Sequence, residues 1–367
     1  QWGEMFSNVG DFDGVSNYTN TLEGNNGEFI ARVGTENRMQ VLGHISLLGY
    51  SGEMIHPLCS GGATESALGD AQELSMAQWA QQCIDQNGLV VMPHAPNPQC
   101  ERAANIIMGL VHAMEMMVFN PHDVTISPYG IADWYRFLNL GYAVPVVGGS
   151  DKMAASSLLG GIRTYTQLGE LELNYENWMT ATKSGNTFVT VGPLVEIDLE
   201  GTAPGGRIDI NGTATLTLNW KVESVRVPVT QIEIIVGGRG VQSHTPANPL
   251  SDSGSVEISI TEATWVAVRV RGNYKSDDDI AAHSSAIQVI VDQKAIYNQD
   301  DAVSVLKQIE GALAYVDTIA ARPDADRYRK MRLTLESAHN TMHQRMHSEG
   351  VYHDHTVLHG HEHGHEH

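Results

Sequence analysis

Four side chains of types that commonly bind metal ions lie in or close to short apolar runs of the sequence: Glu36, His44, His94 and Asp151. His44 lies in the run 41–48, His94 follows the run 89–92, and Asp151 follows the run 143–147. Short apolar runs of this kind are typical of buried strands. Because parallel barrels collect their functional groups at the C-terminal ends of strands, we expect the four side chains to meet at one rim. Two carboxylates and two imidazoles together suit Fe, Mn or Zn.

Each of these residues also has a purely structural interpretation. A histidine after a strand more often hydrogen-bonds to the backbone than binds a metal, and an aspartate after Gly-Gly-Ser is often a helix N-cap. Glu115 lies inside the apolar run 111–119, where an unpaired carboxylate would be costly to bury. For Glu115 we favour a structural ion pair, or support of a ligand, over direct metal binding.

The segment 29–191 contains the elements that must position these side chains. It alternates apolar runs with stretches of helical spacing, which predict helices over 75–86, 131–139 and 175–183. A glycine follows each helix within two residues, as expected at a helix C-terminus. Continuous apolar strands that alternate with helices indicate a parallel sheet or barrel.

The pattern changes near residue 192, where apolar and polar residues begin to alternate. Turn-rich segments separate four such runs: 214–220, 231–236, 255–260 and 265–270. This rhythm is typical of a small antiparallel β-sandwich of about 100 residues.

The C-terminal region has a different character again. Helical spacing over 303–320 and 328–346, with Pro323 between them, predicts a helical hairpin. Residues 353–367 contain seven histidines, which predicts a disordered segment whose imidazoles can bind soft divalent metals. A solvated tail with incidental metal affinity and a metal-buffering tail are equal alternatives. The predicted organisation is therefore a strand-and-helix domain over 1–192, a β-sandwich over 193–297, a helical hairpin over 298–350 and a disordered His-rich tail over 351–367.

The composition excludes several classes of partner. Among 367 residues, Lys and Arg number 22 against 43 Asp and Glu, and the formal charge is −21. This balance argues against nucleic acid and against an anionic membrane surface, because both require clustered cations. No run of about 18 apolar residues occurs, so no membrane-spanning helix is predicted. The three cysteines are an odd number at irregular spacing, which predicts buried thiols rather than a disulfide framework.

Several segments together resemble the polymerase-and-histidinol-phosphatase (PHP) superfamily of metallohydrolases, in particular its CehA/McbA-type subgroup. Residues 34–38 and 43–49 resemble the third motif of the superfamily. Residues 91–94 resemble its later His-bearing strand, and 149–151 resemble its final Asp strand. The resemblance extends over roughly residues 10–347, and the order and spacing of the motifs carry it. Supporting segments are 10–14, 160–165, 185–193 and 282–285.

The resemblance implies a distorted (β/α)7 barrel that holds Fe, Mn or Zn, with more than one ion in the complete protein. It also implies that the metal lowers the pKa of a bound water to give a hydroxide nucleophile. By motif match, Glu36, His44, His94 and Asp151 are the expected ligands. We add Arg163 as a candidate contact to a substrate anion, with an unassigned surface arginine as the alternative.

Two departures from the superfamily pattern affect this expectation. Neither the opening His-x-His strand nor the following Asp-His strand occurs before Glu36. The final strand usually reads Asp-x-His, whereas here Met153 stands at the third position, and a thioether is a poor ligand for hard metals. Lys152 could instead act as a fixed cation beside the site. We therefore expect a partial barrel, completed by a missing N-terminal segment or by an oligomer partner.

The expected fold is α/β: a partial distorted (β/α)7 PHP-type barrel, a small β-sandwich and a C-terminal helical hairpin. The expected function is metal-dependent hydrolysis of an ester, amide, carbamate or phosphoester bond in a small-molecule substrate. Two alternatives stay open. One is a non-catalytic module that binds a small molecule or a glycan, and the other is a metal-binding protein that acts through its His-rich tail.

Overall fold

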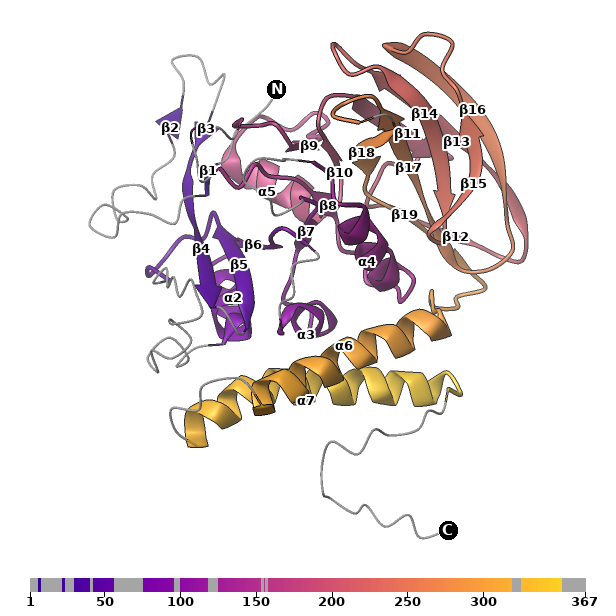
Figure 1. Cartoon of the computed structure of the whole chain (residues 1–367). Helices are drawn as coiled ribbons and strands as arrows, with labels where there is room; N and C mark the ends of the chain where they lie inside the picture. Colours follow the sequence, from indigo (N-terminus) through magenta and orange to yellow (C-terminus); the bar gives the residue numbers. More distant parts are fainter. Residues whose placement is uncertain are drawn as a thin grey trace.

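The computed structural model describes residues 6–7, 22–23, 30–39, 42–55, 75–95, 100–117, 125–152, 155, 158–276, 278–318 and 325–351. Figure 1 shows a mixed sheet with its helices, a large β-sandwich and a pair of long C-terminal helices. Cys59, the supporting segment 10–14 and nearly all of the His-rich tail lie outside the described residues. No described helix is both long enough and apolar enough to cross a membrane.

The N-terminal half is built on a six-stranded mixed sheet with the order β1-β4-β5-β6-β7-β8. β4 is antiparallel to β5 and β5 is antiparallel to β6, whereas β6, β7 and β8 run parallel. A separate two-stranded sheet joins β2 (Leu22–Glu23) and β3 (Ile30–Ala31). The six strands are β1 (Phe6–Ser7), β4 (Val33–Met39), β5 (Gly43–Leu48), β6 (Leu89–Met92), β7 (Ala113–Glu115) and β8 (Val146–Val147).

The expectation of a partial (β/α)7 barrel was wrong. In such a barrel every strand runs parallel to the next and a helix connects each pair. Here β4 and β5 form an antiparallel hairpin, and within the described residues the sheet ends at β1 on one side and at β8 on the other. The rest of the described chain is also dominated by antiparallel strands, and strands outnumber helices. The described part of the chain is therefore a mixed sheet that does not close, joined to a β-sandwich.

Helices cover both faces of the mixed sheet. α2 (Met76–Asp85), α3 (Arg102–Ile107) and α4 (Pro128–Leu138) pack on one face. On the other face, α5 (Tyr175–Lys183) contributes Tyr175 and Met179 to a smaller core with residues of β5 to β8. α2 begins where the sequence predicts, because Ser75 and Gln78 form a capping box that satisfies free backbone N–H groups.

The β-sandwich predicted after residue 192 is confirmed. A three-stranded sheet, β11-β13-β16, faces a larger sheet that contains β12, β19, β17, β18, β10 and β9, with β14 and β15 attached. Alternate residues of both sheets form one apolar core, in which Leu218, Ile232 and Val268 are fully buried. The strands before β15 are β9 (Arg163–Thr166), β10 (Thr187–Thr190), β11 (Leu194–Leu199), β12 (Arg207–Ile210), β13 (Ala214–Glu223) and β14 (Val229–Val236). The remaining strands are β15 (Arg239–His244), β16 (Ser251–Ile260), β17 (Thr264–Gly272), β18 (Asp279–Ser284) and β19 (Ile287–Val291).

Strand pairing crosses the boundary that the sequence pattern suggested at residue 192. β9 and β10 precede that boundary, yet both belong to the larger sandwich sheet, where β10 is antiparallel to β18. Ser285 completes the connection, because its hydroxyl accepts from the backbone N–H of Val146 at β8. The mixed sheet and the sandwich are thus joined by hydrogen bonds.

The C-terminal helices α6 (Gln299–Thr318) and α7 (Ala325–Ser348) lie side by side under the mixed-sheet layer (Figure 1). Both contribute apolar residues to the core that contains α2, α3 and α4. Buried Asp133 of α4 adds a polar connection, because it pairs with Arg102 of α3 at 2.7 Å and accepts from Gln308 of α6 at 2.9 Å.

Candidate metal centre

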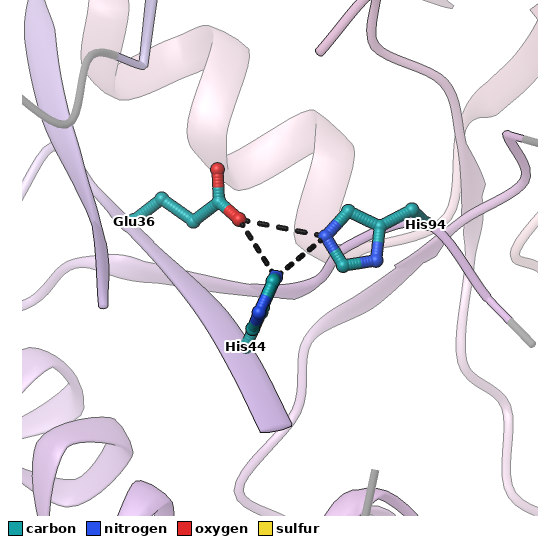
Figure 2. A group of neighbouring side chains, drawn as sticks. All are labelled: Glu36, His44 and His94. Carbon is teal, nitrogen blue, oxygen red and sulfur yellow. Dashed lines mark hydrogen bonds and ion pairs between the residues drawn. The ribbon is translucent and has the colours of Figure 1, made fainter. Parts of the chain in front are cut away.

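Glu36, His44 and His94 form a compact group in which the potential ligand atoms all lie within 4.8 Å of one another. Figure 2 shows the carboxylate and the two imidazoles pointing toward a common point. His44 Nδ1 lies 2.9 Å from His94 Nε2, and these nitrogens lie 3.3 Å and 3.4 Å from Glu36 Oε1. Among the described residues, no other group of three or more His, Cys, Asp or Glu side chains has spacing that could hold a metal ion.

The β4–β5 hairpin positions two of the three side chains. In its register Arg38 is opposite His44, and Glu36 is opposite Ser46. Since alternate residues of a strand point to the same face, these four side chains share one face of the hairpin. Glu36 and His44 are therefore diagonal neighbours, close enough for side chains of their length to meet.

His94 reaches the group from the parallel part of the sheet. It follows β6 by two residues and has a φ of 34°, a backbone conformation that is uncommon for a residue with a side chain. Its backbone N–H donates to Glu115 Oε2 at 2.7 Å. Strained backbone of this kind concentrates at functional sites, where the surrounding structure holds it in place.

The electrostatics of the group favour an anionic Glu36. Burial opposes ionisation of this carboxyl, but hydrogen bonds with His44 and His94 outweigh burial and lower its pKa to about 2. Burial also opposes the charged form of His94, yet the nearby Glu36 and Glu115 carboxylates raise its pKa above the ordinary value. The negative charge of Glu36 is thus stabilised by two imidazoles that offer nitrogen atoms at the same point.

Glu115 lies behind His94 at the end of β7. Burial raises its pKa to about 7, and repulsion from Asp151 and Glu36 acts in the same direction. Its other oxygen, Oε1, lies against Gly149, where an added Cβ would come within 2.1 Å. Glu115 is not in the group of three, and its contact is with the backbone of His94, which orients that residue.

Asp151 interacts electrostatically with Glu36, His44 and His94 but is not one of the three grouped residues. It follows β8 with a φ of 38°, so two of the four predicted ligands have left-handed backbone conformations. Burial and repulsion from Glu36 raise the pKa of Asp151, whereas His94 and Arg38 oppose that rise. Lys152, next in the chain, is exposed.

Arg163 is engaged outside the group of three. It lies on β9, where its Nε donates to the Tyr165 hydroxyl at 3.1 Å and its Nη1 donates to the Gly160 carbonyl at 3.0 Å. The guanidinium also lies 5.2 Å from the centre of the Tyr165 ring. These contacts hold the arginine against its own strand and the preceding loop.

Arg38 is a residue of the site that sequence reasoning missed. It shares the β4 face with Glu36, stands opposite His44, and interacts electrostatically with Asp151. The signal was present in the sequence as a two-residue spacing from Glu36, which places both side chains on one face of a strand. It became interpretable only when segment 33–39 was seen to be a strand.

The donor set fits a divalent transition metal. One carboxylate oxygen and two imidazole nitrogens are ligands that Zn, Fe and Mn accept, and catalytic zinc sites with two histidines and one glutamate use this combination. Burial is the main cause of the raised pKa values of Glu115 and Asp151, and repulsion among the Glu36, Glu115 and Asp151 carboxylates adds to it. A bound cation would relieve this repulsion.

Comparison with known proteins does not identify a family, since no family model and no curated protein matches the chain. Three solved structures show limited similarity, each over about a quarter of this chain. Fibronectin(III)-like modules of Clostridium thermocellum CbhA are 19% identical, with a TM-score of 0.19, over 26% of this chain and 94% of theirs. A Jonesia denitrificans lytic polysaccharide monooxygenase is 18% identical, with a TM-score of 0.15, over 24% and 60%. A CARDB domain from Pyrococcus furiosus is 12% identical, with a TM-score of 0.19, over 28% and 97%.

Proposed function

We propose that this protein is a metal-dependent hydrolase whose metal ion is held by Glu36, His44 and His94. The observation that carries the proposal is the convergence of one carboxylate oxygen and two imidazole nitrogens within 4.8 Å, from the β4–β5 hairpin and the segment after β6. Two imidazoles and one carboxylate that converge on one point match the three protein ligands of a catalytic zinc site, which leaves a further position for water.

The proposed reaction is hydrolysis of an ester, amide, carbamate or phosphoester. A bound divalent cation supplies Lewis acidity and lowers the pKa of a water ligand toward neutrality. Glu36 stays anionic at all physiological pH values, because its pKa is about 2. Glu115 fixes the backbone of His94, and Asp151, beside the same group, is the proposed fourth ligand.

The resemblance to PHP-superfamily metallohydrolases of the CehA/McbA type supports the same class of activity. Its motif positions include Glu36, His44 and His94, the three residues that the structure brings together. The proposal rests on this site and does not extend to a closed barrel. The cofactor is proposed to be Fe, Mn or Zn, and the substrate a small molecule.

Lys152 and Arg163 have secondary places in the proposal. Lys152 adjoins Asp151 in the chain and is exposed, so it is proposed as a fixed cation for an anionic substrate. Arg163 would have to exchange its contacts with Tyr165 and Gly160 to reach a substrate. Lys152 is therefore the preferred candidate for contact with a substrate anion, and Arg163 is the second.

The test is metal content and hydrolysis in one set of purified chains. Because the seven tail histidines would bind metal on their own, the parent is the full chain with those histidines replaced by asparagine. The parent is expected to retain Fe, Mn or Zn after dialysis and to hydrolyse an aryl ester, carbamate or phosphoester. Relative to the parent, Glu36→Gln and His94→Gln are expected to lose the metal of the Glu36 centre, seen as a fall in metal content, and at least about 100-fold of the activity, a loss of roughly 3 kcal/mol in transition-state stabilisation.

The control is His244→Gln. His244 lies in β15 of the sandwich and pairs with Asp252, so its replacement removes one histidine without touching the site. A parent that binds no metal would contradict the proposal. Bound metal with no turnover of any substrate class would instead favour a non-catalytic binding module.

A further inference from the structure

A second group of imidazoles lies on helix α7, far along the chain from the proposed centre. His339, His343 and His347 occur at four-residue intervals, which places them on one face of a helix. The His343 and His347 rings have centroids 4.1 Å apart. The His339 and His343 rings are stacked, with centroids 5.9 Å apart and planes inclined by 11°. We call these three residues the α7 histidine stripe.

The stripe borders the apolar face of α7 without belonging to it. Each stripe histidine directly follows a residue that is fully buried in the core: Ala338, Met342 and Met346. The histidines themselves are only partly buried. The core contacts of the helix are therefore made by its neighbours, and the imidazoles lie at the edge of that core, where Nε2 of His343 is shielded from solvent.

A carboxylate from the partner helix meets one end of the stripe. Glu310 Oε1 of α6 lies 3.5 Å from His339 Nε2. A carboxylate that contacts a histidine fixes the orientation of that ring. The packing of α6 against α7 thus adds a negative charge to a row of nitrogen donors.

We propose that the α7 histidine stripe is a second metal site, which binds a divalent ion of the Zn, Ni or Cu class through His343 and His347. Two histidines one helical turn apart can chelate one zinc ion from the same face. Imidazole is a ligand that zinc, copper and nickel all accept. His339 and Glu310 lie one turn away and supply the supporting charge.

This site is independent of the hydrolase proposal, because none of its residues belongs to the mixed sheet. It also differs from metal binding by the tail, since the stripe is part of a packed helix. The tail sequence that follows α7 nevertheless contains seven more histidines, so the C-terminal region concentrates one type of ligand.

The experiment is a calorimetric titration with zinc. The parent is the full chain with its seven tail histidines replaced by asparagine. His343→Gln and His347→Gln are expected to weaken one zinc-binding event by at least about tenfold. Each comparison differs only on α7, so the result does not depend on whether the Glu36 centre binds metal.

The decisive variant keeps the number of histidines and changes only their spacing. His347→Gln combined with Gln344→His leaves three histidines on α7, but residue 344 lies on a different face from residue 343. This variant is expected to lose the same binding event as His347→Gln, with unchanged helical circular dichroism. Zinc affinity equal to that of the parent, in a folded spacing variant or in His343→Gln, would overturn the proposal.

Discussion

One carboxylate, that of Glu115, and two backbone conformations shape the geometry of the proposed centre. His94 and Asp151 both have positive φ values, and the backbone of His94 is held by Glu115. Gly149 in turn leaves room for the Glu115 carboxylate, because a side chain at position 149 would clash with it. The position of His94 therefore depends on Glu115 and Gly149, and a substitution at Gly149 tests this dependence.

Gly149→Ala is expected to disturb the metal centre without touching a ligand. The added methyl group would lie 2.1 Å from Glu115 Oε1, so the buried carboxylate must move and its hydrogen bond to His94 must lengthen. We expect the affinity of the Glu36 centre for zinc to fall by about 10-fold to 100-fold, as for other residues that support metal ligands. Equilibrium zinc titration measures this change.

Gly311→Ala is the matched control for Gly149→Ala. Gly311 lies inside α6, and a methyl group there would meet nothing within 4 Å. It should leave zinc affinity unchanged and raise stability by about 0.5–1 kcal/mol, because alanine is the better helix former. Equal zinc affinities for the two alanine variants would show that the contact between Gly149 and Glu115 has no part in metal binding.

At the scale of elements, one buried carboxyl connects two helices of the mixed-sheet layer. Glu101 precedes α3, is fully buried, and accepts from the backbone N–H of Ala77 at the start of α2 at 3.0 Å. Burial raises its pKa to about 7, although the hydrogen bonds from the first turn of α2 oppose that rise. The folded state is therefore more stable while this carboxyl is protonated, because burial penalises the charged form more than the hydrogen bonds from α2 favour it.

Glu101→Gln is expected to change the pH dependence of unfolding. The folded pKa of Glu101, about 7, exceeds the ordinary value of 4.5. The protonated carboxyl therefore contributes stability that is fully present below pH 4.5 and is lost as pH rises through 7. At pH 8 the glutamine variant should be more stable than the parent by about 3 kcal/mol, whereas at pH 4.5 the two should be equal. Urea denaturation at both pH values measures the difference, and a constant difference would contradict the assignment.

At the scale of the whole molecule, the mixed-sheet layer and the sandwich share a buried hydrogen-bond chain. His283 of β18 donates from Nδ1 to the Ser284 carbonyl, and its Nε2 accepts from the Tyr135 hydroxyl of α4 at 2.6 Å. Burial lowers the pKa of His283 to about 3, so the imidazole is neutral at physiological pH. Trp265 of the sandwich adds a second link by donating to Asn139 at 2.7 Å.

Tyr135→Phe is expected to destabilise the protein by about 1–3 kcal/mol, since it leaves the buried Nε2 of His283 without its donor. Ring packing against Trp265 is retained, so the loss reports on the hydroxyl. Urea denaturation followed by tryptophan fluorescence measures it. Tyr129→Phe, at an exposed tyrosine, is the control and should change stability by less than about 0.5 kcal/mol. A loss as small as that of the control would contradict a role for this bond in joining the two parts.

Much of the local structure could be predicted from local patterns. The helix over 175–183 and the strand over 89–92 have the predicted bounds, because their caps, glycines and apolar runs are short-range signals. The alternation after residue 192 also identified four of the sandwich strands, β13, β14, β16 and β17, since a strand with one buried face must alternate. Glu36, His44, His94 and Asp151 were predicted as ligands from residue type, strand proximity and the motif resemblance, and the first three lie together in the structure.

What the tertiary structure decided was the direction in which strands pair and the partners that result. An apolar run is compatible with parallel or antiparallel neighbours, so the sequence could not exclude a barrel, whereas the β4–β5 hairpin does. That same antiparallel register brings Glu36 diagonally onto His44, and the parallel pairing of β6 and β7 brings Glu115 to His94. Within the site, Glu36 and His94 meet although they lie 58 positions apart in the chain. Residue types therefore determined which chemistry was available. Long-range strand pairing determined which side chains meet, because pairing uses backbone hydrogen bonds that every residue except proline can make.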